Sequence, residues 1–256
     1  MVAAIRASLG LARSIATYYG RPRRNRSQAR FYQQFFEPGA LAFDIGAHVG
    51  NRARALRAAG ARVVAVEPQP LFARFLRRTL PRDIVLIEAA VGPQESRTQM
   101  RVSRLHPTVS SLSPDFSDEA ARVPGFGHVA WDDRVEVAVT TLDALIARHG
   151  LPAFVKIDVE GFEAEVLQGV SVPLPCVSVE FLPGMQARTG RVLRRLAELG
   201  RYEFNAVRGE DSALLWTEWR TAAELEAWLG TLAAGSTSGD LYARLVAGAP
   251  PAPKAG

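Results

Sequence analysis

Two short stretches of the sequence combine carboxylates with glycines at spacings that could bind a nucleoside and act on the group it carries. The first is Phe43-Asp44-Ile45-Gly46-Ala47-His48-Val49-Gly50, and the second is Lys156-Ile157-Asp158-Val159-Glu160-Gly161. Each stretch begins in an apolar run, which predicts that its acids lie near the end of a buried strand. Open α/β sheets bind their ligands outside the carboxyl ends of the strands. We therefore expect these residues to face a ligand.

The first stretch predicts a strand, a glycine turn and a helix over residues 51–59. Gly46 has no Cβ, so the backbone can turn sharply there and come close to a ligand. Gly50 should allow the new helix to pack against the strand. A second buried strand is predicted over residues 61–66, and it ends in Glu67-Pro68. An acid at that strand end can accept hydrogen bonds from the two hydroxyls of a ribose, so we predict a nucleoside site.

The residues around the glycine turn distinguish between classes of nucleoside. A dinucleotide fingerprint reads G-x-G-x-x-G and holds a pyrophosphate at a helix N-terminus. Here His48 stands where that pattern has its second glycine, and Asp44 precedes the turn. A negative charge at Asp44 would repel a pyrophosphate but attract the ammonium group of an amino acid. This pattern favours S-adenosyl-L-methionine as the cofactor.

Further strands and helices are predicted along the chain. Residues 70–80 should form an amphipathic helix, and residues 84–89 a third strand after which Ala90 would flank an adenine ring. Residues 175–182 predict a later strand. Two more segments, 202–207 and 213–217, predict a terminal antiparallel pair.

Residues 93–134 interrupt this alternation. Residues 98–103 and 135–140 predict a hairpin, and we interpret the polar loop between them as a lid over the substrate. The loop contains His106 and His128, which are either acid–base residues or, as we favour, surface histidines.

A length of 256 residues suits one α/β domain with short extensions. We predict a basic N-terminal arm over residues 1–30, the domain over 31–246 and a flexible tail over 247–256. Cys176 is the only cysteine and lies in an apolar run, so we expect a buried, inert thiol.

The formal net charge of +5 is unevenly distributed. Residues 1–30 contain seven arginines and no acid, which leaves the rest of the chain at about −2. We therefore expect a nearly neutral body, which argues against a nucleic-acid partner. The arm either contacts an anionic membrane surface or a partner or, as we favour, is a solvated leader. No apolar stretch approaches the roughly 20 residues that span a bilayer, so we expect a cytoplasmic protein, at most peripheral to a membrane.

Taken together, these stretches resemble the FkbM family of S-adenosylmethionine-dependent methyltransferases. The matching segments are residues 43–51, 64–68, 89–92, 141–143 and 155–161. The Lys-Ile-Asp-x-Glu-Gly stretch is the most specific of them. The resemblance implies an α/β fold with a doubly wound, seven-stranded Rossmann-like sheet, an antiparallel last strand, and a hairpin inserted between strands 3 and 4.

The resemblance also implies roles for individual residues. Glu67 would hold the ribose hydroxyls, Ala90 would touch the adenine, and Asp158 would face the reacting centre. The full set of expected cofactor-binding residues is Asp44, Gly46, Ala47, His48, Gly50, Glu67, Pro68, Ala90 and Asp158.

The activity implied by the resemblance is methyl transfer to an oxygen acceptor, and we expect a hydroxyl of a sugar, a glycan or a small secondary metabolite. A carboxylate within hydrogen-bond reach can take the proton of such a hydroxyl. Asp158 and Glu160 are the candidates, with Lys156 tuning their charge, although Asp158 could instead contact the cofactor. The three charges could also form a self-satisfied cluster. A divalent metal held by these acids could also hold the acceptor, but no set of His, Asp or Glu has convincing ligand spacing, so no metal site is predicted.

Two other functions stay open at this point. A nicotinamide-dependent oxidoreductase is disfavoured by Asp44 and His48. A non-catalytic nucleoside-binding module, docked through the basic arm, would not need to keep the acids. The sequence identifies neither the acceptor nor the oligomeric state.

Overall fold

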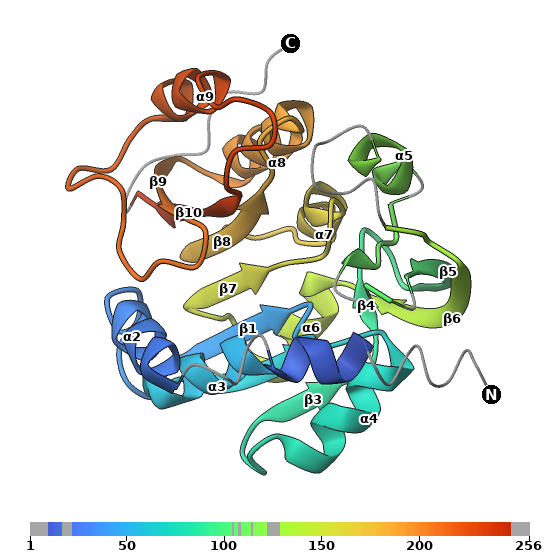
Figure 1. Ribbon diagram of the computed structural model, residues 1–256. Coiled ribbons are helices and arrows are strands. Elements are labelled where there is room, and N and C mark those ends of the chain that lie inside the picture. Colours follow the sequence, from blue (N-terminus) through green and yellow to red (C-terminus); the bar gives the residue numbers. More distant parts are fainter. Residues whose placement is uncertain are drawn as a thin grey trace.

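The computed structural model describes residues 10–16, 22–103, 105–106, 109–113, 115–121 and 129–246. Its main feature is a seven-stranded sheet in the order β3-β2-β1-β7-β8-β10-β9 (Figure 1). The strands of this sheet are β1 (Leu41–Ile45), β2 (Arg62–Val66), β3 (Val85–Ile87), β7 (Phe154–Ile157), β8 (Cys176–Phe181), β9 (Tyr202–Arg208) and β10 (Gly239–Leu245). A second sheet, in the order β4-β6-β5, contains β4 (Ala90–Val91), β5 (Ser96–Val102) and β6 (Asp133–Thr140).

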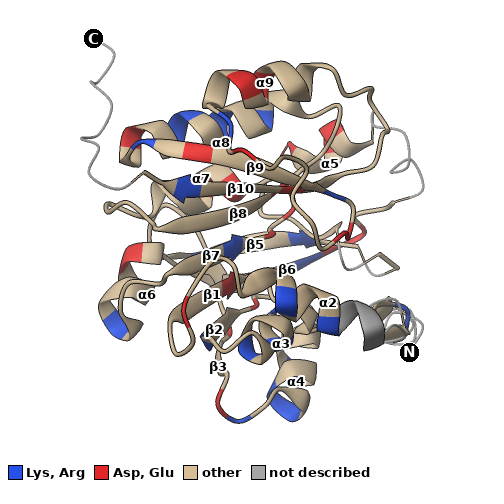
Figure 2. Ribbon diagram, turned by 90° about the vertical axis from the view of Figure 1, so that its left-hand side faces the viewer, with Lys and Arg blue, Asp and Glu red and all other residues tan. Residues whose placement is uncertain are grey.

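Helices cover both faces of the main sheet (Figures 1 and 2). One layer contains α2 (Pro22–Tyr32), α3 (Asn51–Ala58) and α4 (Pro70–Thr79). The other helices are α5 (Phe116–Ala120), α6 (Leu142–His149), α7 (Glu163–Gln168), α8 (Gln186–Leu199) and α9 (Ala222–Gly230). None of the helices in the described parts of the chain has both the length and the apolar character needed to cross a bilayer.

β1 lies between β2 and β7 in the main sheet, and all five of its residues are buried. It pairs in parallel with β2 on one side and β7 on the other, so that Phe43 lies opposite both Val64 and Val155. Strands that are buried on both faces have continuous apolar sequences, which is why these strands could be predicted from the sequence. The carboxyl ends of β1, β2 and β7 therefore meet at one edge of the sheet.

Of the predicted terminal strand pair, the first strand is confirmed as β9, but its predicted partner is wrong. β9 pairs with β10, with Leu241 opposite Ala206, and β10 also pairs antiparallel with β8. The segment 213–217 forms no strand, although the Leu215 N–H donates to the Ala206 carbonyl over 2.8 Å. β10 carries Asp240 and Arg244 within a mostly buried strand, and these charges hid it from a reading based on apolar runs.

Three local predictions are confirmed or adjusted by the structure. The hairpin is confirmed, because β5 and β6 pair antiparallel with Met100 opposite Val135. The third strand is shorter than expected, and Ala90 begins β4, which pairs with β6 in the second sheet. Gly50 has a left-handed φ of +80°, and a Cβ there would lie 2.8 Å from a methyl of Leu76 in α4. Gly50 thus lets α3 approach α4 and not only the strand.

Charge is divided between the two halves of the molecule. Residues 22–82, which contain α2, α3 and α4, hold twelve arginines and three acids. Residues 83–256 hold 16 basic and 23 acidic residues. Figure 2 shows the arginines of α2, α3 and α4 in blue along one layer. The net charge of the body is therefore near zero only because a basic part and an acidic part offset each other.

Candidate cofactor and active site

A cavity opens at the edge where β1, β2 and β7 end. It encloses about 540 Å³ of empty space, counting the part open to solvent. Its wall contains residues from the turns after these strands, from the β5–β6 hairpin and from the start of α7, namely Ile45, Gly46, His48, Val66, Glu67, Pro68, Gln69, Ala89, Ala90, Val91, Met100, Ser110, Leu112, Asp158, Val159, Glu160 and Phe162. We refer to it as the first cavity.

Glu67 is held at the wall of the first cavity by two backbone groups. The His48 N–H donates to Oε2 and the Gln69 N–H donates to Oε1, each over 2.8 Å. Only 3% of the residue is exposed, and this burial raises the pKa of the carboxyl to about 8. Each oxygen can accept a second hydrogen bond. The side chain therefore fits the two hydroxyls of a ribose.

The two glycine-containing stretches touch at Gly46. This residue has φ +86°, and a Cβ built on it would lie 1.9 Å from the carbonyl oxygen of Asp158. Any side chain here would push the turn after β1 away from the turn after β7. The neighbouring His48 also has a positive φ of +51°, and burial lowers the pKa of its imidazole to about 4. His48 is therefore neutral where it lines the cavity.

Asp44 lies behind the cavity wall, buried beneath the turn. Burial raises the pKa of its carboxyl to about 7, against the attraction of Lys156, and the Ala53 N–H in the first turn of α3 donates to it. Its Oδ2 atom has no hydrogen-bond partner among the described residues. Its contact with an ammonium group stays a prediction. Gly50 also lines neither this cavity nor the adjoining one described next.

A second cavity of about 460 Å³, again counting its open part, adjoins the first. The two share Gly46, His48, Asp158 and Glu160, and the remaining wall of the second is formed by Ala47, Asn51, Arg52 and Glu210. The sequence did not single out Arg52 or Glu210. Arg52 lies two residues after Gly50, and this proximity to the glycine motif was a usable signal, whereas Glu210 lies between the two segments of the predicted terminal pair.

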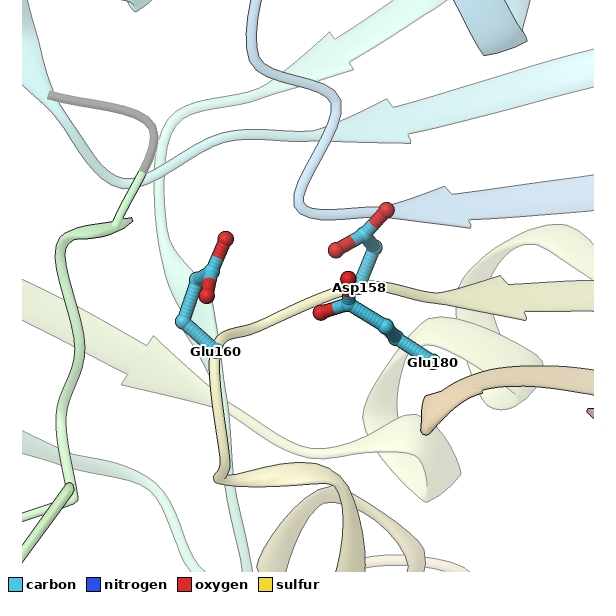
Figure 3. Close-up of side chains that lie close together, drawn as sticks. All are labelled: Asp158, Glu160 and Glu180. Atoms are coloured by element: carbon cyan, nitrogen blue, oxygen red, sulfur yellow. The ribbon is translucent and has the colours of Figure 1, made fainter. Parts of the chain in front are cut away.

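Three carboxylates converge beside the shared wall (Figure 3). Asp158 and Glu160 come from the turn after β7, and Glu180 comes from β8; one oxygen of each lies within 4.8 Å of the others. Glu160 has φ +54°, so it is placed by the turn and not by strand alternation. Glu180 was missed because it belongs to a different strand. The prediction of no metal site used spacing along the chain only, and these three acids are ligand types that a divalent cation accepts.

Lys156 supports this cluster from inside the sheet. Its Nζ lies 3.2 Å from Asp158 Oδ2 and 2.9 Å from Asp240 Oδ1, with no exposed surface. Burial acts to raise the pKa of Asp158, but the attraction of Lys156 and Arg52 outweighs it and holds the pKa below its ordinary value. Burial and the charge of Asp158 raise the pKa of Glu160 well above its ordinary value. Neighbouring carboxyls with pKa values pushed apart can divide the roles of acid and base.

Glu180 shares the environment of Glu160. Burial and the charges of Glu160 and Asp158 raise the pKa of Glu180 well above its ordinary value. The cluster thus places one ionised carboxylate beside two that retain protons more strongly.

The inserted segment reaches the site through its described residues. Ser110 and Leu112 line the first cavity, and the Ser111 hydroxyl donates to the Glu160 carbonyl over 2.6 Å. Arg188 of α8 donates to Glu119 over 2.6 Å, which ties α5 to the body. The closing of this segment as a lid stays a prediction. His106 lines neither cavity, and His128 lies outside the described residues.

The predicted cofactor residues divide into three groups by position. The wall of the first cavity contains Gly46, His48, Glu67, Pro68, Ala90 and Asp158. Ala47 lines the second cavity, while Asp44 and Gly50 lie behind the wall. The paired hydrogen-bond acceptors of Glu67 and the close approach of the two turns at Gly46 fit S-adenosylmethionine.

Comparison with solved structures finds methyltransferases of low sequence similarity. An O-methyltransferase from Bacillus cereus in complex with SAH is 14% identical with a TM-score of 0.43, over 93% of this chain and 90% of that one. Magnesium protoporphyrin IX methyltransferase from Synechocystis PCC 6803 with bound SAM is 11% identical with a TM-score of 0.43, over 92% and 84%. Precorrin-6y C5,15-methyltransferase from Geobacter metallireducens is 12% identical with a TM-score of 0.40, over 85% and 87%.

Comparison at the family level is more specific. None of the curated proteins matches the chain. The model of the methyltransferase FkbM domain matches residues 44–229, which include both glycine-containing stretches. The chain belongs to the FkbM family of methyltransferases, and S-adenosyl-L-methionine is its cofactor.

Proposed function

We propose that this methyltransferase acts on a hydroxyl oxygen of a sugar, a glycan or a small secondary metabolite. The observation that carries the proposal is the cluster of Asp158, Glu160 and Glu180 beside the cavities, within 4.8 Å of one another. A hydroxyl is a poor nucleophile until it loses its proton, so its methylation benefits from a carboxylate base. An acceptor that is nucleophilic without proton loss would need no such group.

The three charged residues of the second stretch take different roles in this proposal. The cofactor, when bound, supplies a methyl group already activated by its sulfonium. Glu160 takes the proton of the acceptor hydroxyl from its ionised form, which the raised pKa makes a stronger base than the Asp158 carboxylate. Asp158 remains ionised and orients the hydroxyl, and Lys156 keeps it in that state. Holding the hydroxyl in line with the methyl group supplies much of the remaining rate.

The test is a search for methylated products with isotopically labelled cofactor. The purified protein is incubated with panels of monosaccharides, oligosaccharides and hydroxylated metabolites, and the position of the label is read by mass spectrometry and NMR. We expect label on oxygen. We also expect Glu160→Gln to lower kcat by about 100-fold while the affinity for S-adenosylhomocysteine stays within about twofold.

The matched control is Glu198→Gln, which removes an exposed carboxylate that pairs with Arg195 over 2.7 Å. It should leave kcat unchanged. Label on nitrogen or carbon, or an unchanged kcat in Glu160→Gln, would refute the proposal.

A further inference from the structure

Arg52 is the only cationic side chain on the wall of the second cavity, within the part of the chain that the structure describes. It lies in the first turn of α3, directly after the glycine motif, and 15% of its side chain is exposed. Its Nη2 lies 2.7 Å from Glu210 Oε2 and 3.9 Å from Asp240 Oδ2. The cation is thus shared by one carboxylate at the cavity mouth and one in the sheet.

The position of the second cavity determines which part of the cofactor it receives. The first cavity contains Glu67 for the ribose and Ala90 for the adenine side. A molecule bound there can extend past Gly46 and Asp158 into the second cavity, because both residues line both cavities. The end of S-adenosylmethionine farthest from adenine carries an α-ammonium and an α-carboxylate. The second cavity must therefore accommodate one charge of each sign.

The wall of the second cavity contains more acidic than basic side chains that could pair with the two charges of the cofactor. The ammonium can meet the carboxylate of Asp158, whereas the guanidinium of Arg52 is the one cation that the described residues of this wall offer to the α-carboxylate. Arginine binds carboxylates with paired N–H donors in a fixed geometry. Glu210 already occupies that guanidinium. Glu210 follows β9, and 39% of its side chain is exposed. Movement toward solvent would break its contact with Arg52 and the 3.3 Å hydrogen bond that it accepts from Gln28 Nε2.

We infer that Arg52 receives the α-carboxylate of the cofactor and that Glu210 occupies this position as an internal substitute until the cofactor binds. The inference rests on the cofactor and not on the nature of the acceptor. It differs from an ordinary structural ion pair in one respect. The two partners should affect cofactor affinity in opposite directions, because one is the receptor and the other its competitor.

The test compares two ligands by calorimetry on the full chain. S-adenosylhomocysteine carries the amino-acid part, whereas 5′-methylthioadenosine has a methyl in its place. We expect Arg52→Met to weaken binding of the first ligand by about tenfold, and Glu210→Gln to strengthen it by about threefold. Binding of 5′-methylthioadenosine should change by less than about twofold in either variant, which also shows that each variant is folded.

A second ion pair on the same helix supplies the matched control. Arg57 of α3 pairs with Asp83 over 2.7 Å and lines neither cavity. Arg57→Met and Asp83→Asn should leave the affinity for both ligands unchanged. Weaker S-adenosylhomocysteine binding in Glu210→Gln would overturn the competition. If Arg52→Met lowers the affinity for both ligands equally, Arg52 has a structural role. If neither ligand binds to the unaltered protein, the assignment of the cofactor is itself refuted.

Discussion

Asp44 and Glu67 retain protons in the folded protein near neutral pH, because burial raises their pKa values to about 7 and about 8. In the unfolded chain both carboxyls have pKa values of about 4. Between these values the folded state binds more protons than the unfolded state, so the free energy of unfolding falls as the pH rises. The site therefore keeps two buried acids at a cost in stability above neutral pH.

The first prediction concerns this pH dependence. Glu67→Gln removes one of the two titrating groups and should flatten the fall in melting temperature between about pH 5 and pH 8.5. Circular dichroism at constant ionic strength measures it, and the difference between the two proteins isolates Glu67 from other titrating groups. An identical slope in the variant would contradict the raised pKa of Glu67.

The second prediction concerns the ribose. An ionised carboxylate is a stronger hydrogen-bond acceptor than a neutral carboxyl. The affinity for S-adenosylhomocysteine should therefore rise between about pH 6 and pH 9. In Glu67→Gln this rise should be smaller, because only Asp44, with a pKa raised to about 7, remains of the two buried acids. Glu67→Ala should lose about tenfold in affinity, or about 1.4 kcal/mol. If calorimetry finds the same affinity for S-adenosylhomocysteine in Glu67→Ala, Glu67 does not bind the ribose.

At the scale of elements, β10 connects the last part of the chain to the site. Its Asp240 lies 2.9 Å from Lys156, which in turn lies 3.2 Å from Asp158. A buried cation needs such partners, because removing one member of a buried pair leaves an uncompensated charge. The antiparallel last strand thus has an electrostatic function as well as a pairing one.

The third prediction follows from that contact. Lys156→Met should lower the free energy of unfolding by about 3 kcal/mol, because it leaves Asp158 and Asp240 without their shared cation. Arg57→Met, which breaks an exposed ion pair, should cost less than about 1 kcal/mol. Urea denaturation measures both. Equal losses would show that Lys156 contributes no more than a surface residue.

The elements that could be predicted from the sequence are those specified by local patterns. The glycine turn at Gly46 and the strand ending at Glu67 each depend on a few neighbouring residues, and β5 and β6 are each marked by their own local pattern although a long segment separates them. β10 could not be found in this way, because its place between β8 and β9 depends on pairing across the chain. Glu180 and Glu210 reach the site through the same long-range pairing.

At the scale of the whole molecule, the α2–α4 layer is basic. Two of the three acids in residues 22–82, Asp44 and Glu67, are buried. Arg26, Arg30 and Arg78 are exposed. Anionic surfaces attract such clusters within a Debye length. For the arm, contact with a membrane was the alternative to the favoured solvated leader, and for this layer such contact is a prediction.

The fourth prediction tests this expectation. Vesicles that contain phosphatidylglycerol should sediment the protein at low salt, and vesicles of phosphatidylcholine alone should not. Replacing Arg26, Arg30 and Arg78 by Gln should lower the bound fraction by about tenfold. The control replaces Arg134, Arg148 and Arg201, which are exposed outside this layer, and it removes the same charge. Equal losses in the two variants would show an effect of net charge alone.

The position of β10 also constrains the order in which the protein can be completed on the ribosome. β1, β2, β7 and β8 can pair as they emerge, but β9 joins the sheet only through β10, which is made after it. Until then Lys156 lacks Asp240. A nascent chain that stops before residue 239 therefore contains both glycine-containing stretches but lacks the Asp240 carboxylate that pairs with Lys156. Synthesis of the last strand is the step that makes the site electrostatically complete.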